Sequence, residues 1–254
     1  MASYDIIGNI AVIKTEGKTK NQKYELARQL LERPSIKTVL EKVGKVQGRL
    51  RKIKTKYLIG EKNFIAVYKE NDCLFKLNIE TCYFSPRLSN ERKEIASYVR
   101  KKDEVLVMFS GVGSYPIVIY KLSNPKKITA IEISKECNKY FKENLRLNKI
   151  HSEKIELIQG DVKKKLSSKK FDVVIMPRPN LKDTFFKYGL KAAKKGTKII
   201  TYGFCKENEK ENFVEKLKKE AGKLKRKIQI KKIKKAGEIA PYKFRYRIEI
   251  NVLN

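Results

Sequence analysis

Glu91 and Arg87 lie in the segment CYFSPRLSNER, residues 82–92, just ahead of the run EVLVMFSGVG, residues 104–113. The segment has the pattern of a strand end, a turn stopped by proline, and a helix capped by Ser89. Glu91 would then lie in the first helical turn, where the helix dipole favours a negative charge. Because a carboxylate can also accept a proton, the segment is a candidate for acid–base chemistry as well as for helix stabilisation.

The turn after the apolar run carries Gly111 and Gly113, which allow a sharp bend and the close approach of a ligand. The next apolar run ends at Glu132, where a carboxylate can accept hydrogen bonds from a ribose diol. A third run ends at Asp161. In many open α/β sheets that bind nucleotides, the residue at this position contacts an adenine amine. Taken singly, these residues also fit a structural turn, a solvated cap and a turn-forming aspartate.

This turn is not a dinucleotide-binding fingerprint, because Pro116 stands where the third glycine would be. The phosphate-binding pattern GxxxxGK[ST] is absent as well, which disfavours ATP chemistry. The remaining pattern resembles class I S-adenosylmethionine-dependent methyltransferases, which need a ribose anchor, an adenine slot and an open face for the methyl group.

A fourth apolar run, FDVVIM, ends in the loop Pro177-Arg178-Pro179. In methyltransferases that act on amino or ring nitrogens, the loop at this strand end holds a flipped-out base. The two prolines remove backbone donors and stiffen such a wall. An ordinary proline-rich turn is the alternative interpretation.

No metal site is expected. The four cysteines form no CxxC pair, and His151 is the only histidine. Cys73 and Cys82 could face each other across paired strands, but small buried thiols are the favoured interpretation of all four.

The elements that position these residues fall into two parts. From residue 89 onward, apolar strands alternate with helical patterns, which predicts a doubly wound parallel sheet with helices on both faces. A hairpin-like pair at about 226–234 and 243–252 would add an antiparallel strand at the sheet edge. The preceding residues form a small α+β module with a strand over 4–14, a helix ended by Pro34, and β-rich runs. The predicted domains are residues 1–82 and 83–254.

The charge distribution indicates a polyanionic partner. The chain of 254 residues has 60 Lys and Arg against 28 Asp and Glu, a net charge of +32. Such a charge attracts nucleic acid over a long range and makes binding dependent on salt. A lysine-rich proteome of a hyperthermophile is an alternative source of the same excess. No apolar stretch reaches the length of a membrane span and no signal-peptide pattern opens the chain, so we expect a cytoplasmic protein.

The segments SYDIIGNIAVI, CYFSPRLSNER, VMFSGVG, MPRP and APYKFRY together closely resemble archaeal tRNA (guanine-37-N1)-methyltransferases. The resemblance extends over essentially the whole chain, and the SPRLSxER block is its most specific part. The MPRP loop resembles the bifunctional branch that also methylates 4-demethylwyosine in the wyosine pathway. The resemblance implies a class I methyltransferase fold, Rossmann-like, with S-adenosylmethionine as the cofactor and tRNA as the partner.

The resemblance also implies roles for individual residues. Glu91 matches the general base that takes the proton from guanine N1, and Arg51 matches the arginine that neutralises charge on O6. Tyr83 and Arg87 match residues that organise the target nucleotide and the active site. The matches in the cofactor pocket are Phe109, Glu132 and Asp161, and those in the base-binding loop are Pro177 and Pro179.

The predicted reaction is methyl transfer to N1 of guanosine 37 in the anticodon loop, with C7 methylation of 4-demethylwyosine as a second activity. Relatives commonly carry a further small N-terminal domain that contacts the outer corner of tRNA. This sequence begins almost directly at the second module, so we expect tRNA recognition to depend more on phosphate contacts, with Lys52, Lys54, Lys56, Arg178 and residues 223–235 as the candidates. We also expect a monomer. The alternatives are a methyltransferase of another RNA, such as rRNA, and a non-catalytic basic RNA-binding module.

Overall fold

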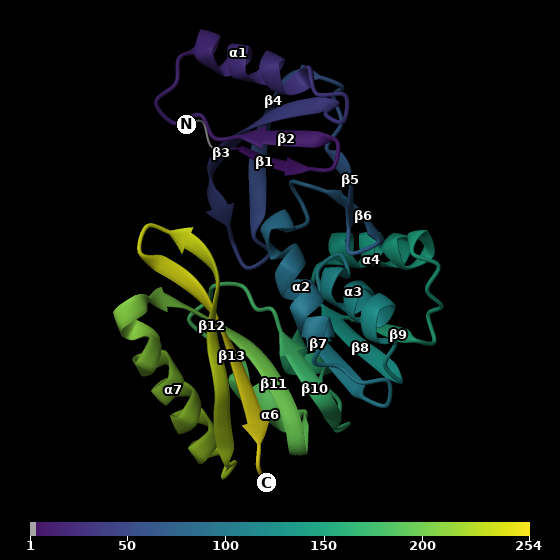
Figure 1. Ribbon diagram of the computed structural model, residues 1–254, viewed down its shortest axis with the longest axis vertical. Helices are drawn as coiled ribbons and strands as arrows, with labels where there is room; N and C mark the ends of the chain where they lie inside the picture. The colour runs from purple at the N-terminus through teal and green to yellow at the C-terminus, as the bar shows by residue number, and fades with distance from the viewer. Residues whose placement is uncertain (1–3) are drawn as a thin grey trace.

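The computed structural model describes residues 4–254, except for the side chains of residues 45–47. An N-terminal part with its own sheet lies above a larger part built on a second sheet (Figure 1). The first strand of the N-terminal part, β1, lies far from the C-terminal end of the chain, which belongs to the larger part (Figure 1). Among the described residues, no helix is both long and apolar enough to cross a membrane.

The N-terminal sheet has four strands in the order β1-β2-β3-β4. Their bounds are Tyr4–Ile7, Ile10–Ile13, Thr38–Gln47 and Lys52–Gly60. Helix α1, Lys20–Leu31, begins after a capping box formed by Thr19 and Gln22 and packs its buried side against this sheet. The prediction of a single strand over residues 4–14 is wrong, because the chain reverses at Gly8 and forms the antiparallel pair β1–β2. Strand β4 was not predicted.

The larger sheet has seven strands in the order β12-β13-β11-β10-β7-β8-β9. In chain order these strands span Glu104–Met108, Lys127–Glu132, Ile155–Gln159, Phe171–Met176, Ala193–Lys206, Ile228–Ala240 and Lys243–Val252. Strands β7 to β11 pair in parallel, and β13 pairs antiparallel with both β11 and β12. The predicted doubly wound sheet with an antiparallel edge is confirmed.

Helices cover both faces of this sheet (Figure 1). Helices α2, α3 and α4 contribute to one buried apolar cluster, and α5, α6 and α7 contribute to another. The helices span Ser89–Ala96, Ser114–Ser123, Lys135–Leu147, Val162–Lys165, Phe186–Lys191 and Lys210–Lys223. Ser89 does not cap α2 as predicted, because a 3₁₀ turn over Pro86–Leu88 runs directly into the helix and Leu88 occupies the cap.

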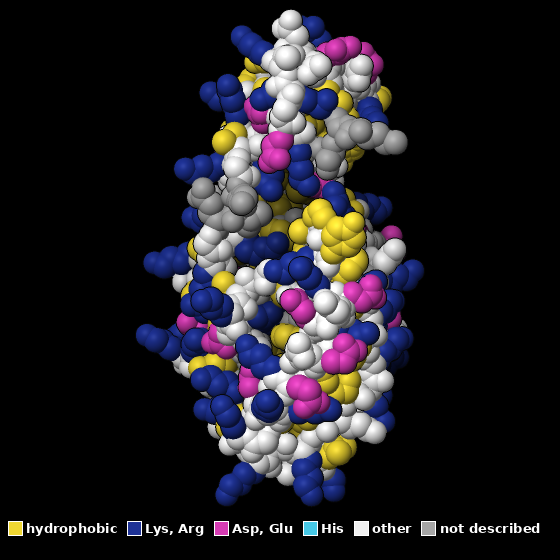
Figure 2. All heavy atoms as spheres, turned by 90° about the vertical axis from the view of Figure 1, so that its left-hand side faces the viewer, with side chains coloured by type: hydrophobic (Ala, Val, Ile, Leu, Met, Phe, Trp, Pro, Cys, Tyr) yellow, Lys and Arg dark blue, Asp and Glu magenta, His cyan; other side chains and the backbone are white. Residues whose placement is uncertain are grey.

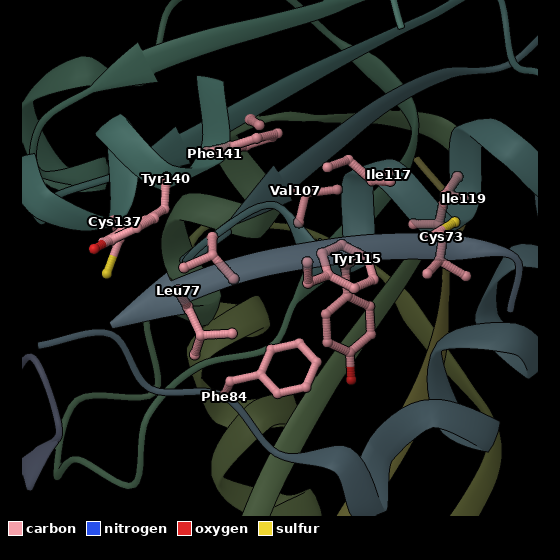
Figure 3. Packing of buried hydrophobic residues seen from close by; sticks show 14 of the residues in the cluster. Cys73, Leu77, Phe84, Val107, Tyr115, Ile117, Ile119, Cys137, Tyr140 and Phe141 are labelled. Atoms are coloured by element: carbon pink, nitrogen blue, oxygen red, sulfur yellow. The ribbon is translucent and has the colours of Figure 1, made fainter. Parts of the chain in front are cut away.

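A hairpin of β5, Ile65–Glu70, and β6, Cys73–Asn78, joins the two parts. The side-chain amides of Asn144 and Asn148 in and after α4 exchange hydrogen bonds with the backbone of β6. Its apolar side chains pack with α3, α4 and β7 in one cluster (Figure 3). The hairpin is therefore fixed to the large sheet, and it holds the following segment CYFSPRLSNER against the carboxyl ends of the parallel strands.

Candidate active site

A cavity of about 110 Å³ lies at the carboxyl ends of β7, β8 and β10, the edge at which open α/β sheets bind ligands. Three residues of the loop between β3 and β4, Arg49, Leu50 and Arg51, help to line it. The residues expected at the site that line this cavity are Arg51, Tyr83, Phe109, Gly111, Glu132, Pro177 and Pro179. The structure thus brings together residues from both parts of the chain, separated by up to 128 positions in the sequence.

The glycine turn and Glu132 form one end of the cavity. The backbone N–H groups of Gly111 and Ser134 each donate a hydrogen bond of 2.8 Å to the Glu132 carboxylate. Burial raises the pKa of Glu132, although these backbone donors oppose the shift. The turn needs left-handed backbone at Gly113, where φ is +90° and a Cβ would lie 2.4 Å from the ring of Phe141. This end can hold a polar diol against a fixed carboxylate.

Asp161 lies near this end but does not line the cavity. Both of its carboxylate oxygens accept hydrogen bonds of 3.0 Å from Arg49, which does line it. The Arg49 guanidinium holds the pKa of Asp161 below its usual value. An adenine amine that contacts Asp161 would have to share it with Arg49, a residue that the sequence analysis did not single out.

Arg51 and Tyr83 also line the cavity. The Arg51 guanidinium lies 3.5 Å from the centroid of the Tyr83 ring, which is a close cation–π contact. Burial lowers the pKa of Arg51. A second cavity begins at the same two residues and extends between the two parts of the protein, where Arg87 lines it and pairs with Asp5 at 2.6 Å.

Glu91 is buried behind the cavity and is not among the residues that line it. Its carboxylate accepts hydrogen bonds from the Tyr202 hydroxyl at 2.7 Å and from Arg247 at 2.9 Å. Tyr202 in turn lies 3.2 Å, oxygen to oxygen, from the hydroxyl of Tyr115, which does line the cavity. Two tyrosine hydroxyls therefore link Glu91 to a residue that lines the cavity.

Arg178 corrects one expectation. Its side chain is 3% exposed, and its guanidinium donates to the backbone carbonyls of Tyr202, Leu181 and Asp183. Desolvation lowers the pKa of Arg178 to about 10. A guanidinium bound in this way cannot contact a tRNA phosphate, so that expectation is wrong. Arg178 instead fixes the loop that presents Pro177 and Pro179 to the cavity.

Arg245 is a site residue that the sequence analysis missed. It lines the cavity, is 6% exposed, and lies with its guanidinium 4.1 Å from the centroid of the Tyr202 ring. Burial disfavours its charge, but the electrostatic influence of Tyr115 and Tyr202 raises its pKa above the usual value. The segment APYKFRY, which contains Arg245, was noted only as part of the resemblance, and nothing local in it predicts burial at the cavity.

The described residues contain no group of three or more His, Cys, Asp or Glu side chains that could hold a metal ion. All four cysteines are free and buried, as expected. Cys82 does not face Cys73; its sulfur lies 2.8 Å from that of Cys137, which lines the cavity.

Residues 66–230 match the TRM5/TYW2 methyltransferase domain, and residues 1–63 match the TYW2 N-terminal domain. The chain belongs to the TRM5/TYW2 methyltransferase family. Among its relatives is the tRNA (guanine(37)-N(1))-methyltransferase Trm5b of Pyrococcus abyssi, 29% identical over 98% of this chain and 74% of the relative. The crystal structure of that Trm5b superposes with a TM-score of 0.89 and covers 99% of this chain.

Two further relatives of this TRM5/TYW2 methyltransferase carry names from the wyosine pathway. The tRNA (guanine(37)-N(1))/4-demethylwyosine(37)-methyltransferase Taw22 of Nanoarchaeum equitans is 39% identical over 60% of this chain and 50% of its own length. The tRNA 4-demethylwyosine(37)-methyltransferase Taw21 of Saccharolobus solfataricus is 30% identical over 83% of this chain and 80% of its own length. A solved complex of aTrm5 with tRNALeu, 27% identical, has a TM-score of 0.87 and covers 99% of this chain and 72% of its own.

Proposed function

We propose that this protein transfers the methyl group of S-adenosylmethionine to N1 of guanosine 37 in the anticodon loop of tRNA. The observation that carries the proposal is that one cavity is lined both by Glu132, a ribose-type anchor, and by the stacked pair Arg51 and Tyr83. The names of Trm5b and Taw22 support the same reaction.

The cavity suits S-adenosylmethionine in its donor set. Glu132 offers a buried carboxylate to the ribose hydroxyls, and the Gly111 turn and Phe109 border the space beside it. Once bound there, the cofactor supplies an electrophilic methyl group. Pro177 and Pro179 form a stiff wall for the target base, which must leave its stack to enter.

The chemistry explains the charged residues. Guanine N1 carries a proton at neutral pH, so its lone pair is unavailable until a base removes that proton. Glu91 serves as this base, and Arg51 neutralises the charge that develops on O6. Positioned base catalysis contributes about 10²–10⁴-fold, and a charged donor to a developing oxyanion contributes roughly 3 kcal/mol. Tyr83 holds the guanine ring beside Arg51. Arg87 lies along the second cavity, where it can contact neighbouring nucleotides.

The proposal is tested with two unmodified tRNA transcripts that differ only at position 37. With radiolabelled S-adenosylmethionine, the transcript with guanosine 37 is expected to gain one methyl group and the transcript with adenosine 37 none. Equal labelling of both transcripts would indicate a methyltransferase of another nucleotide. Binding of tRNA without labelling of either transcript would indicate a non-catalytic RNA-binding module.

A second activity, methylation of C7 of 4-demethylwyosine to give isowyosine, is favoured by the MPRP loop and by the names of Taw21 and Taw22. The test supplies tRNA that carries 4-demethylwyosine at position 37 and measures the mass of the modified nucleoside. A gain of one methyl group is expected, and an unchanged mass would limit the enzyme to guanosine.

Cofactor binding is expected to weaken as the pH falls. Because burial raises the pKa of Glu132, this carboxyl takes up its proton at a higher pH than an ordinary glutamate and then loses its strength as a ribose acceptor. Calorimetry of S-adenosylmethionine binding between about pH 8 and pH 5 measures the effect. Glu132→Gln is expected to lower affinity about 10–100-fold and to remove this pH dependence. Asp161 does not produce the same signal, since its pKa is lowered.

In this proposal, the basic surface of the protein binds the phosphates of tRNA. Lys and Arg side chains are spread over the face shown in Figure 2, which is hollowed between the N-terminal part and the rest of the molecule. Lys52, Lys54 and Lys56 alternate along β4, and all three are exposed. We further propose that the enzyme acts as a monomer in the cytoplasm and contacts phosphates through these lysines and the basic 223–235 segment.

Replacement of Lys52, Lys54 and Lys56 by glutamine is expected to weaken tRNA binding and to reduce the slope of log affinity against log salt by about 2 to 3. Fluorescence titration of tRNA at several salt concentrations measures both. The matched control replaces three exposed lysines at the amino ends of the parallel strands: Lys101, Lys102 and Lys154. If both triple variants change the slope equally, the contribution of these lysines to tRNA binding is a general effect of net charge and not a specific contact.

A further inference from the structure

Two tyrosines stand between the cavity and the buried carboxylate of Glu91. We propose that the proton of the target base reaches Glu91 through the hydroxyls of Tyr115 and Tyr202, which act as a two-step relay. The inference rests on the proposed function, because it assigns a path to the proton which that reaction must remove.

The geometry of the hydroxyls forms a continuous path. Tyr115, in the first turn of α3, lines the cavity and packs beside Phe84 in the cluster of Figure 3. Its hydroxyl oxygen lies 3.2 Å from that of Tyr202, and the Tyr202 hydroxyl donates to Glu91 at 2.7 Å. Tyr202 is fully buried in β11. Since Glu91 does not line the cavity in this structure, this path connects its carboxylate to the bound base.

The direction of the hydrogen bonds fits transfer toward Glu91. Because Tyr202 donates to Glu91, its oxygen is free to accept the proton of Tyr115, and Tyr115 then has a lone pair for the proton on N1. In the step, the N1–H bond breaks and its electron pair stays on N1, which would form the new bond to the methyl carbon as the bond from that carbon to the donor sulfur breaks and leaves its electron pair on sulfur. The N1 proton binds the Tyr115 oxygen, the Tyr115 proton moves to Tyr202, and the Tyr202 proton forms an O–H bond on Glu91. Both tyrosines end neutral.

The surrounding charges tolerate the protonation of Glu91. Arg247, its buried partner, also pairs with Glu94 at 2.5 Å and with Glu249 at 2.8 Å, so it keeps two carboxylates when Glu91 becomes neutral. The Arg245 guanidinium over the Tyr202 ring stabilises negative charge that develops on the hydroxyl oxygens during transfer. Burial raises the pKa of Tyr202 well above its usual value, which disfavours a lasting tyrosinate and favours concerted movement of the protons.

The first test is Tyr202→Phe, which keeps the ring under Arg245 and removes only the hydroxyl. We expect the single-turnover rate of methylation of guanosine 37 to fall about 10–100-fold, with unchanged dissociation constants for tRNA and S-adenosylmethionine. Tyr115→Phe should give a similar loss, and the double variant should be little slower than either one because both hydroxyls serve the same path. A purely structural role would instead change binding or the thermal unfolding midpoint.

The matched control is Tyr98→Phe. The Tyr98 hydroxyl accepts a hydrogen bond from Arg247 and donates to Glu94, so it belongs to the same buried network but lies off the path from the cavity. The single-turnover methylation rate of the Tyr98→Phe variant should stay within about threefold of the wild-type rate.

A second measurement needs no variant. The single-turnover rate of the wild-type enzyme in mixtures of H₂O and D₂O should depend on the deuterium fraction along a curve, since several protons move in one step. A linear dependence, or full rates in both phenylalanine variants, would overturn the relay. If the wild-type enzyme does not methylate guanosine 37, the proposed function itself fails, which distinguishes the two outcomes.

Discussion

Glu91→Gln is expected to lower the single-turnover rate of methyl transfer to guanosine 37 by about 10²–10⁴-fold. The amide keeps the size of the side chain and can still accept a hydrogen bond from Tyr202, but it cannot take up a proton at neutral pH. Binding of S-adenosylmethionine and of tRNA should be nearly unchanged, because Glu91 lies outside the cavity lining. Rapid-quench measurement of the methylated tRNA determines the rate.

Loss of fold is not the expected cause, because Arg247 retains Glu94 and Glu249 as partners. Glu94→Gln is the matched control: Glu94 lies one turn further along α2, also pairs with Arg247, and has no contact with the tyrosine path at Tyr202. Its rate should remain within about threefold of the wild type. A Glu91→Gln enzyme with more than a tenth of the wild-type rate would contradict the role of Glu91 as the base.

Glu70→Ala is expected to reduce the free energy of unfolding by about 3–5 kcal/mol, the largest stability effect that we predict. Glu70 and Arg92 form a bidentate ion pair in which each side chain is 2% exposed. Without the carboxylate, the Arg92 guanidinium stays buried with no anionic partner, and it keeps the Ser85 carbonyl and the rings of Phe84 and Tyr115 as favourable contacts. Denaturant unfolding measures the change.

Two further variants check the cause. Glu215→Ala removes an exposed pair with Lys218 and should cost less than about 0.5 kcal/mol. The double variant Glu70→Leu/Arg92→Met should recover much of the loss, because an apolar pair leaves no unpaired charge in the core. If the free energy of unfolding of the Glu70→Ala protein lies within about 1 kcal/mol of the wild-type value, the prediction is wrong. That result would show that Arg92 becomes hydrated through a local rearrangement.

The sequence predicted the larger sheet well, because apolar strands that alternate with helices admit few arrangements. It predicted the N-terminal part less well. The apolar run over residues 4–14 contains a reversal at Gly8, where φ is +57° and a Cβ would lie 1.9 Å from the carbonyl oxygen of Val67. Strand β4 was missed because lysine occupies every second position from Lys52 to Lys56, which resembles a charged loop.

At the site, the sequence predicted the residues that follow strands and turns, and it did not predict those that reach the cavity from distant strands. Tyr202 and Arg247 meet Glu91 from positions 111 and 156 residues away, and only the pairing of β11 with β13 brings them together. Arg178 was expected to contact tRNA phosphates, but it is buried. Its burial depends on backbone carbonyls of later segments that no local pattern indicates.

The most direct test of the central claim, that the cavity places N1 of an extruded guanosine beside the cofactor, is the identity of the methylated atom. A tRNA transcript with guanosine 37 is incubated with S-adenosylmethionine that carries a deuterated methyl group, digested with a nuclease and mapped by tandem mass spectrometry. The account predicts the label in 1-methylguanosine at position 37 alone. Label on another atom of that guanosine, or at another nucleotide, would contradict it.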